Sequence, residues 1–143
     1  MIRLGCDIVY IPRIQAAVER FGDRFLQRVY TSAEQRDCGY TKDTPNRPSI
    51  QQLAGRWAAK EAVVKALGTG WQGVCYTDVE IRRQPSGAPT VILYQGAARV
   101  VAAWGESQWQ LSLSHDRDYA IATALLICSK CNNLTTDVTT PDS

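Results

Sequence analysis

Two carboxylates of this chain stand where they could share one cation. Asp7 lies two residues after Gly5 and between apolar residues, at the expected end of a strand. Glu61 lies four residues before Lys65 in an alanine-rich stretch, so the two side chains share one side of a helix. Mg²⁺ binds through one or two carboxylates, and phosphate and water oxygens complete its shell. Asp7 and Glu61 therefore suggest an Mg²⁺ site.

Two further features could belong to the same cleft. Gly68-Thr69-Gly70 ends the alanine-rich segment, and glycines let a ligand approach the backbone closely. His115 is the only histidine, and it directly follows a predicted strand, where its side chain can reach a cleft.

Each of these residues also has a simpler interpretation. Glu61 and Lys65 fit an exposed ion pair, which stabilises a helix by only about 0.2–0.5 kcal/mol. Asp7 fits a turn residue, and glycines commonly end helices. A single histidine in a turn is commonly solvated. No rival site stands out, because the sequence has no P-loop, no G-x-G-x-x-G and no G-x-S-x-G.

Composition narrows the class of protein. The 143 residues fit one domain with a tail, long enough to bury roughly two-thirds of the surface of the unfolded chain. The net charge is only +2, which gives no argument for nucleic acid or membrane as a partner. No apolar run approaches the roughly 20 residues that span a bilayer. The first residues also lack the apolar core and cleavage site of a signal peptide.

The cysteines favour a reducing compartment. Their number is five, and four of them are scattered without a disulfide-like pattern, so we expect a cytoplasmic protein with reduced thiols. Cys128 and Cys131 form C-x-x-C, but no second pair or histidine stands at zinc spacing. Chance is therefore favoured over a metal or redox role for this pair.

The first half of the chain is expected to be mainly helical. Residues 2–4 predict a short strand that leaves its sheet at residues 5–7. Pro12 suits the start of a helix through residue 21, and a second helix is expected over residues 24–30. Thr31 and Glu34 form a capping box that starts a third. Two prolines predict a loop over residues 41–49.

The long helix is expected over residues 51–67. Its apolar stripe should face the sheet, and consists of Leu53, Trp57, Val64 and Leu67. The flank of that stripe should form a partly covered groove, and consists of Ala54, Ala58, Glu61 and Lys65.

The second half of the chain alternates as strands do. Strands are expected at 79–81 and 91–93 around a turn at 84–89, then a helix over 95–104. A half-buried strand should run through residues 109–113, a turn through 114–118, and a continuous apolar strand through 119–127. We predict an α+β domain over residues 1–128, an antiparallel sheet of hairpins packed on one long helix. Residues 129–143 are polar and are expected to be a disordered tail.

Three segments resemble the holo-[acyl-carrier-protein] synthases, the short bacterial 4′-phosphopantetheinyl transferases. The most specific is Gly55-Arg56-Trp57-Ala58-Ala59-Lys60-Glu61-Ala62, continued by Lys65-Ala66-x-Gly68-Thr69-Gly70. The others are Gly5-x-Asp7-Ile8-Val9 and Leu111-Ser112-Leu113-Ser114-His115. The resemblance covers residues 1–127 and implies transfer of 4′-phosphopantetheine from coenzyme A to a serine of acyl carrier protein. Adenosine 3′,5′-bisphosphate is the other product, and the reaction supports fatty acid biosynthesis.

The resemblance also implies roles for single residues. Asp7 and Glu61 match Mg²⁺ ligands, and Lys65 matches a phosphate-binding lysine. His115 matches a histidine near the coenzyme A phosphates, with Ser114 lining the pocket, and Arg56 is a further candidate phosphate contact. The family implies a homotrimer with active sites between subunits. The base that takes the serine proton is left open between a metal-bound water and a carboxylate.

Carrier binding is implied for the first helices. Arg13, Arg24 and Arg28 match basic positions that hold an acidic carrier protein, and Phe25 would add an apolar anchor. Without the resemblance, the same arginines fit an ordinary solvated face. The chain departs from the family at Tyr10, at Trp57 and at Ala88, but at neither metal ligand.

Overall fold

The computed structural model describes residues 1–40 and 48–130. Most of the predicted loop at 41–49, Cys131 and nearly all of the predicted tail lie outside these residues. In chain order the elements are β1 (Ile2–Tyr10), α1 (Ile11–Phe21), α2 (Asp23–Val29), α3 (Ser32–Asp37), α4 (Ile50–Leu67), the 3₁₀ turn η1 (Tyr76–Asp78), β2 (Val79–Arg83), β3 (Pro89–Leu93), α5 (Gln95–Ala102), β4 (Ser107–Asp116) and β5 (Tyr119–Cys128). The predicted α+β class is confirmed.

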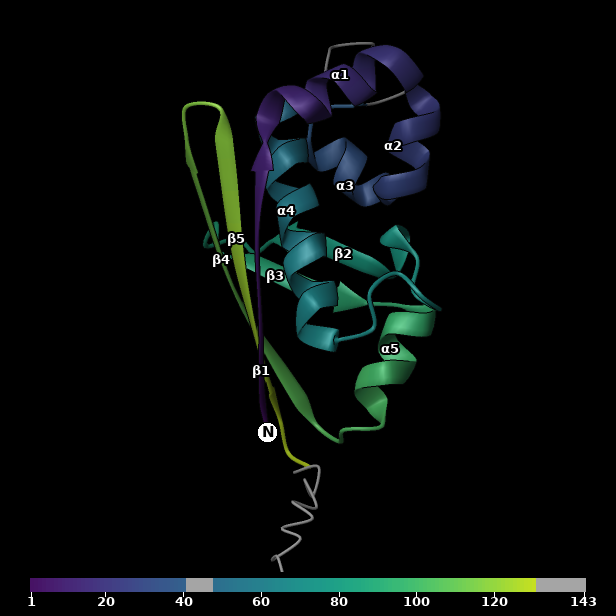
Figure 1. Ribbon diagram of the computed structural model, residues 1–143, viewed down its shortest axis with the longest axis vertical. Helices are drawn as coiled ribbons and strands as arrows, with labels where there is room; N and C mark the ends of the chain where they lie inside the picture. The colour runs from purple at the N-terminus through teal and green to yellow at the C-terminus, as the bar shows by residue number, and fades with distance from the viewer. Residues whose placement is uncertain (41–47, 131–143) are drawn as a thin grey trace, which may run out of the picture.

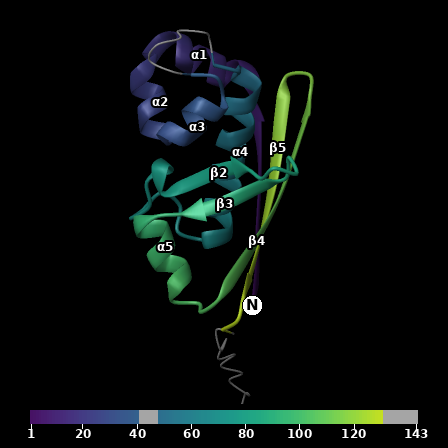
Figure 2. The same ribbon diagram turned by 180° about the vertical axis from the view of Figure 1, so that it is seen from behind.

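Two antiparallel sheets surround the long helix α4 (Figure 1). The larger has the order β1-β5-β4, so the N-terminal strand pairs with the last strand of the domain. The smaller is the hairpin of β2 and β3, which lies across α4 when the molecule is seen from behind (Figure 2). Helices α1 to α3 gather at one end of α4, and α5 lies toward the other end (Figure 1).

Helix α4 is buried on nearly every side. The Ser49 side chain caps its start by accepting from the Gln52 N–H, and Gly68 ends it in the left-handed conformation with φ 76°. Leu53, Val64 and Leu67 are buried as predicted. Trp57 was predicted to face the sheet with them, and this is wrong. Its ring stacks on Phe25 and Tyr76 instead.

Strand β1 approaches α4 closely at Gly5. A Cβ at Gly5 would lie 1.8 Å from the backbone oxygen of Ala62 and 2.8 Å from the backbone nitrogen of Ala66. Only glycine on the strand and alanines on the helix allow this distance. Residues 5–7 were predicted to leave the sheet, but β1 continues to Tyr10. Asp7 pairs with Ala122 of β5 and therefore lies within the sheet.

The larger sheet has one buried and one exposed face. Strand β5, predicted as continuously apolar, alternates between buried and exposed residues. The face toward α4 carries small residues such as Ala122 and Ala124, both fully buried. The opposite face is exposed on this chain and is mainly apolar on β1 and β5, where it includes Ile2, Leu4, Ile8, Tyr10, Tyr119, Ile121 and Ile127. We call this set the outer face of the sheet.

A buried ion pair fastens α3 and β2 to α4. Lys60 and Glu34 are both fully buried, and the Lys60 ammonium lies 2.7 Å from Glu34 Oε1. The same ammonium donates to the backbone oxygens of Tyr76, at 2.9 Å, and Val79. Burial lowers the pKa of Lys60, and the negative charge of Glu34 opposes that shift. Glu34 also completes the predicted capping box with Thr31, which is confirmed.

No helix within residues 1–40 and 48–130 is long and apolar enough to cross a membrane.

Candidate active site

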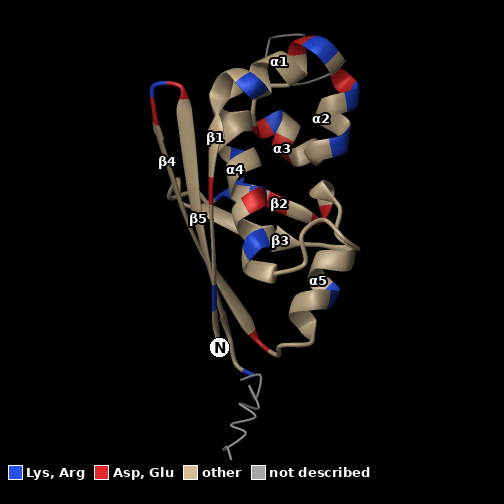
Figure 3. Cartoon of the chain, in the orientation of Figure 1, with Lys and Arg blue, Asp and Glu red and all other residues tan. Residues whose placement is uncertain are grey.

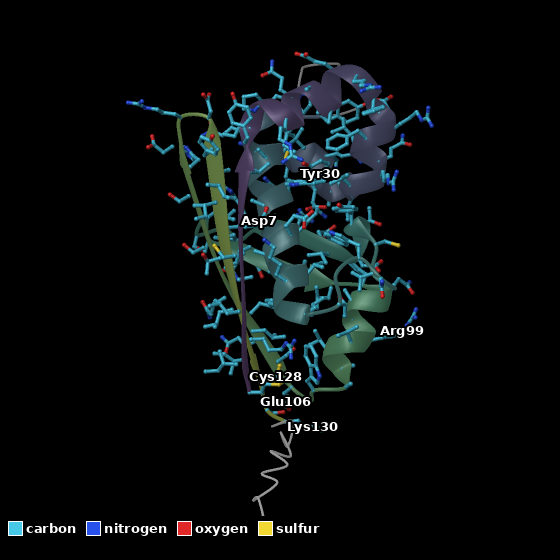
Figure 4. The ribbon with its side chains drawn as sticks, viewed as in Figure 1. Asp7, Tyr30, Arg99, Glu106, Cys128 and Lys130 are labelled. Atoms are coloured by element: carbon cyan, nitrogen blue, oxygen red, sulfur yellow. The ribbon has the colours of Figure 1, made fainter. Side chains whose placement is uncertain are left out.

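Asp7 and Lys65 meet where β1 crosses α4. The Lys65 ammonium donates to Asp7 Oδ1 at 3.0 Å and to the backbone oxygen of Cys6 at 3.0 Å. Figure 4 places Asp7 on β1 beside α4. The hydrogen bond to Asp7 raises the pKa of Lys65, so the ammonium stays protonated. The alternative in which Lys65 simply pairs with Glu61 is wrong, because its ion pair is made with Asp7.

Glu61 lies next to the pair of Asp7 and Lys65, and its carboxylate is partly shielded from solvent. Its side chain is half-buried, and the Tyr76 hydroxyl donates to Oε1 at 3.4 Å. Burial raises the pKa of Glu61, and the negative charge of Asp7 raises it further. Hydrogen bonds from Trp71 and Tyr76 act in the opposite direction. Two carboxylates that raise each other's energy in this way are a favourable setting for a divalent cation.

The site has two carboxylates, a number that Mg²⁺ commonly takes from a protein. Within the parts of the chain that the structure describes, no group of three or more His, Cys, Asp and Glu side chains gathers at one point. Asp7 and Glu61 thus stand as a pair. Mg²⁺ commonly takes one or two carboxylates and leaves its other positions to water and phosphate, whereas zinc and calcium sites need more protein ligands.

Sequence reasoning missed an aromatic stack that leads to Glu61. The rings of Phe25, Trp57, Tyr76 and Trp71 follow one another at centroid distances of 6.1, 5.2 and 3.9 Å. The signal in the sequence was the pair of aromatic residues just after the glycines that end α4. Neither Trp71 nor Tyr76 has a periodic partner that would have marked it as part of the site.

His115 lies apart from Glu61 within its own chain. It was predicted to follow a strand, but β4 continues to Asp116. Its Nδ1 lies 2.7 Å from Gln51 Nε2 in the first turn of α4. Gln51 precedes Glu61 by ten residues, which is about 15 Å along a helix. Ser114 is the neighbouring residue in the strand and projects to the outer face of the sheet, away from α4.

Arg56 has a structural partner instead of a free guanidinium. The residue is 5% exposed, and its Nε donates to the backbone oxygen of Ile81 at 3.2 Å. Its Nη2 lies 3.9 Å from the Asp37 carboxylate. These contacts place Arg56 at the junction of α4, β2 and α3, and its contact with a phosphate stays a prediction.

The residues expected to bind a carrier lie together on α1 and α2. A groove of about 430 Å³ is lined by Phe21, Arg24, Phe25, Arg28, Val29, Trp57 and Tyr76. Arg13 is exposed on α1, outside that lining. Arginine positions recur along α1 and α2, with acidic positions among them (Figure 3). The groove thus has a basic rim and an aromatic floor, and that floor is the stack that reaches Glu61.

Comparison with known proteins agrees with this geometry. A family model described as the 4′-phosphopantetheinyl transferase superfamily matches residues 3–124. The holo-[acyl-carrier-protein] synthase of Gloeobacter violaceus is 54% identical over 125 residues, which cover 87% of this chain and 92% of that protein. The crystal structure of that enzyme from Neisseria meningitidis has a TM-score of 0.77 at 30% identity, covering 89% of this chain and 99% of its own. An ACPS–CoA complex from Chronobacterium ammoniagenes has a TM-score of 0.74 at 31% identity, covering 91% and 99%. With Asp7, Glu61 and Lys65 assembled inside the matched region, the chain belongs to the holo-[acyl-carrier-protein] synthases of the 4′-phosphopantetheinyl transferase superfamily.

Proposed function

We propose that this protein transfers 4′-phosphopantetheine from coenzyme A to a serine hydroxyl of apo acyl carrier protein. The serine oxygen forms a bond to the phosphorus that carries the pantetheine arm, the bond to adenosine 3′,5′-bisphosphate breaks, and the serine proton leaves. The observation that carries the proposal is the meeting of Asp7, Glu61 and Lys65 in a member of this family.

Asp7 and Glu61 are the proposed ligands of Mg²⁺. When bound, Mg²⁺ would neutralise negative charge on the phosphates. The mutual repulsion of the two carboxylates supports the assignment, since a cation between them would relieve it. Both carboxylates come from elements held rigidly against each other at Gly5, so they need little reorganisation to act together.

Lys65 is proposed to bind the phosphates of coenzyme A. Its side chain is 54% exposed although it touches Asp7, so it can turn toward a ligand without unfolding the helix. An ammonium acts as a point charge with three donors and can follow a phosphate oxygen during the transfer. Its raised pKa keeps the charge in place at neutral pH.

The basic groove is proposed to hold the carrier protein. Arg24 and Arg28 line it, Phe25 contributes to its floor, and Arg13 extends the basic surface along α1. Charged residues at the rim of an interface chiefly raise the rate of association with an oppositely charged partner. The groove ends at Tyr76, whose hydroxyl contacts Glu61, so a carrier bound there would deliver its serine near the two carboxylates.

A homotrimer with shared active sites is part of the proposal. The outer face of the sheet exposes Ile2, Leu4 and Ile8 to 70%, 64% and 62%, and exposed apolar surface of this extent is typical of an interface. His115 and Ser114 are separated from Glu61 within one chain. A neighbouring subunit could supply them, as one repeated heterologous contact around a closed ring would do.

The cytoplasm is the proposed location. Cys6 and Cys75 are exposed and not joined in disulfides, which suits a reducing compartment.

The deciding experiment is mass spectrometry of apo acyl carrier protein incubated with this protein, coenzyme A and Mg²⁺. The carrier should gain one phosphopantetheine group, and Asp7→Asn should abolish most of that gain. A carrier that binds but gains no mass would make the protein a binding subunit. Turnover of simple nucleotides without carrier would make it a different Mg²⁺-dependent enzyme.

A further inference from the structure

The backbone of Tyr76 is held in place by hydrogen bonds. Tyr76 begins the 3₁₀ turn η1, and its carbonyl oxygen accepts from the buried Lys60 ammonium at 2.9 Å. Lys60 directly precedes Glu61 on α4. The same turn is closed by a hydrogen bond of 3.0 Å from the Cys75 N–H to Asp78 Oδ2. The backbone of Tyr76 is therefore tied to the turn of α4 that carries Glu61.

The ring of Tyr76 is fixed as firmly as its backbone. Trp57 stacks at a centroid distance of 5.2 Å with 22° between the planes, and Trp71 stacks at 3.9 Å with 27°. Trp57 lies one helical turn before Glu61 on α4. The stacked rings fix the direction in which the hydroxyl points, and the hydroxyl donates to Glu61 Oε1 at 3.4 Å.

Glu61 has few other groups to orient it. Lys65, four residues later, is bonded to Asp7 and to the Cys6 carbonyl instead. The hydroxyl of Tyr76 donates to Oε1 of Glu61, and the Trp71 side chain supplies a further hydrogen bond to this carboxylate. A carboxylate restrained in this way loses less rotational freedom when it binds a cation, which strengthens binding without adding a ligand.

We infer that Tyr76 is a positioning residue for Glu61, holding the carboxylate by its hydroxyl in the orientation in which it and Asp7 can bind one Mg²⁺. The inference rests on the proposed function, because it assumes that Glu61 is a metal ligand. It goes beyond that function because it assigns an effect on metal affinity to a residue that is not itself a metal ligand. Tyr76 is assigned an effect through Glu61 and no direct contact with the metal.

The test is Tyr76→Phe, which removes the hydroxyl and keeps the stacked ring. Mn²⁺ serves as the probe in place of Mg²⁺, and its free concentration is followed by electron paramagnetic resonance in the presence of coenzyme A. The dissociation constant should rise roughly three- to tenfold, the net effect of one ordinary hydrogen bond, because the distance of 3.4 Å is long for a bond to a carboxylate. The Mg²⁺ concentration for half-maximal transfer should rise by the same factor. Because Tyr76 also lines the groove, the metal affinity and not the KM for carrier is the deciding readout.

A matched control is available in the same molecule. The hydroxyl of Tyr94 also donates to a glutamate, Glu80 Oε1, at 3.1 Å, but neither residue belongs to the site. Tyr94→Phe should leave the Mn²⁺ affinity unchanged. A second site variant, Trp71→Phe, keeps a ring against Tyr76 and removes the indole N–H that also bonds to Glu61. It should weaken Mn²⁺ binding in the same direction.

The outcomes separate this inference from the proposed function. If the unchanged protein transfers phosphopantetheine and Asp7→Asn abolishes Mn²⁺ binding, the site stands. Unchanged Mn²⁺ affinity in Tyr76→Phe, or in Trp71→Phe should the first variant not fold, then overturns the positioning role. A protein that binds no Mn²⁺ through Asp7 and Glu61 overturns the metal site and this inference with it. Weaker binding in Tyr94→Phe as well would trace the effect to general loosening of the fold and also overturn it.

Discussion

Replacing Lys60 by methionine tests how the core supports the site. Methionine keeps most of the length of the side chain and removes the ammonium. The variant leaves Glu34 as a fully buried carboxylate without its cation, and the carbonyls of Tyr76 and Val79 without their donor. Breaking a buried ion pair on one side costs about 3–5 kcal/mol. For a domain of this size, 1 kcal/mol moves Tm by about 3–4 °C, so Tm should fall by about 10–20 °C.

The assay is thermal unfolding followed by circular dichroism, with two further variants beside Lys60→Met. The double variant Lys60→Met with Glu34→Gln removes the stranded charge and should recover about 1–3 kcal/mol. Arg82→Met is the matched control, since Arg82 makes an equally short pair of 2.7 Å with Asp37 while 37% exposed. Exposed pairs contribute only about 0–1 kcal/mol, so this control should melt within about 4 °C of the unchanged protein.

Two results would refute the reasoning. A Lys60→Met variant that melts as late as Arg82→Met would mean that the buried pair contributes no more than a surface pair. A double variant no more stable than Lys60→Met would mean that the stranded charge on Glu34 is not the cause of the loss.

Three further predictions concern the charges of the site, the groove and the assembly. Without metal, Glu61→Gln should raise Tm near pH 7, because the pKa of Glu61 is raised above its ordinary 4.5 and its ionisation therefore costs stability; the difference should vanish below about pH 4, where the glutamate is protonated in both states. If Glu61→Gln and the unchanged protein had the same Tm near pH 7 as well as below pH 4, the expected cost of ionising Glu61 would be contradicted. Changing Arg13, Arg24 and Arg28 together to alanine should raise the KM for carrier and weaken its salt dependence, while coenzyme A binding stays constant. Unchanged carrier kinetics would mean that these arginines form an ordinary solvated face. Light scattering should give a trimer, and mixing Asp7→Asn with His115→Ala protomers should restore transfer that neither has alone; a fully active monomer would rule out shared sites.

Much of the fold could be predicted because its signals are local. Helix α4 follows from seventeen residues of consistent helical pattern with glycines at the end, and α3 from the capping box of Thr31 and Glu34. The β2–β3 hairpin follows from alternation on both sides of a turn rich in proline and glycine. These features depend on residues close together in the chain, where propensity and periodicity are informative.

The misassigned residues depend on partners far away in the sequence. Gly5 to Asp7 looked like the end of a strand, since glycine and aspartate are uncommon within strands, but contact with Ala62 and Ala66 requires that glycine. Arg56 was a candidate phosphate contact by the resemblance alone, and its hydrogen bond to a backbone oxygen of β2 gives no local signal in the sequence. Trp57 fitted the apolar stripe by spacing, yet aromatic rings outside α4 hold it elsewhere.

The candidate site was predictable only in part, because some of its contacts join residues that lie far apart in the sequence. Asp7, Glu61 and Lys65 were named from the sequence, and the structure brings them together. The ion pair between Lys65 and Asp7 was not foreseen, because residues 58 positions apart give no periodic signal. The hydrogen bond from the Tyr76 hydroxyl to Glu61 was not foreseen either, because Tyr76 lies in an irregular turn that has no periodic pattern.

The close approach at Gly5 bears on which ion the site can select. Asp7 stands two residues beyond Gly5 on β1, and Glu61 stands one residue before Ala62 on α4, so the gap between strand and helix sets the span between the two carboxylates. Mg²⁺ requires oxygens at about 2.0–2.1 Å, whereas Ca²⁺ accepts about 2.3–2.6 Å. One added methyl group at Gly5 would push the strand outward and widen that span. If Asp7 and Glu61 hold the cation as proposed, discrimination by ionic radius depends on a residue that has no side chain.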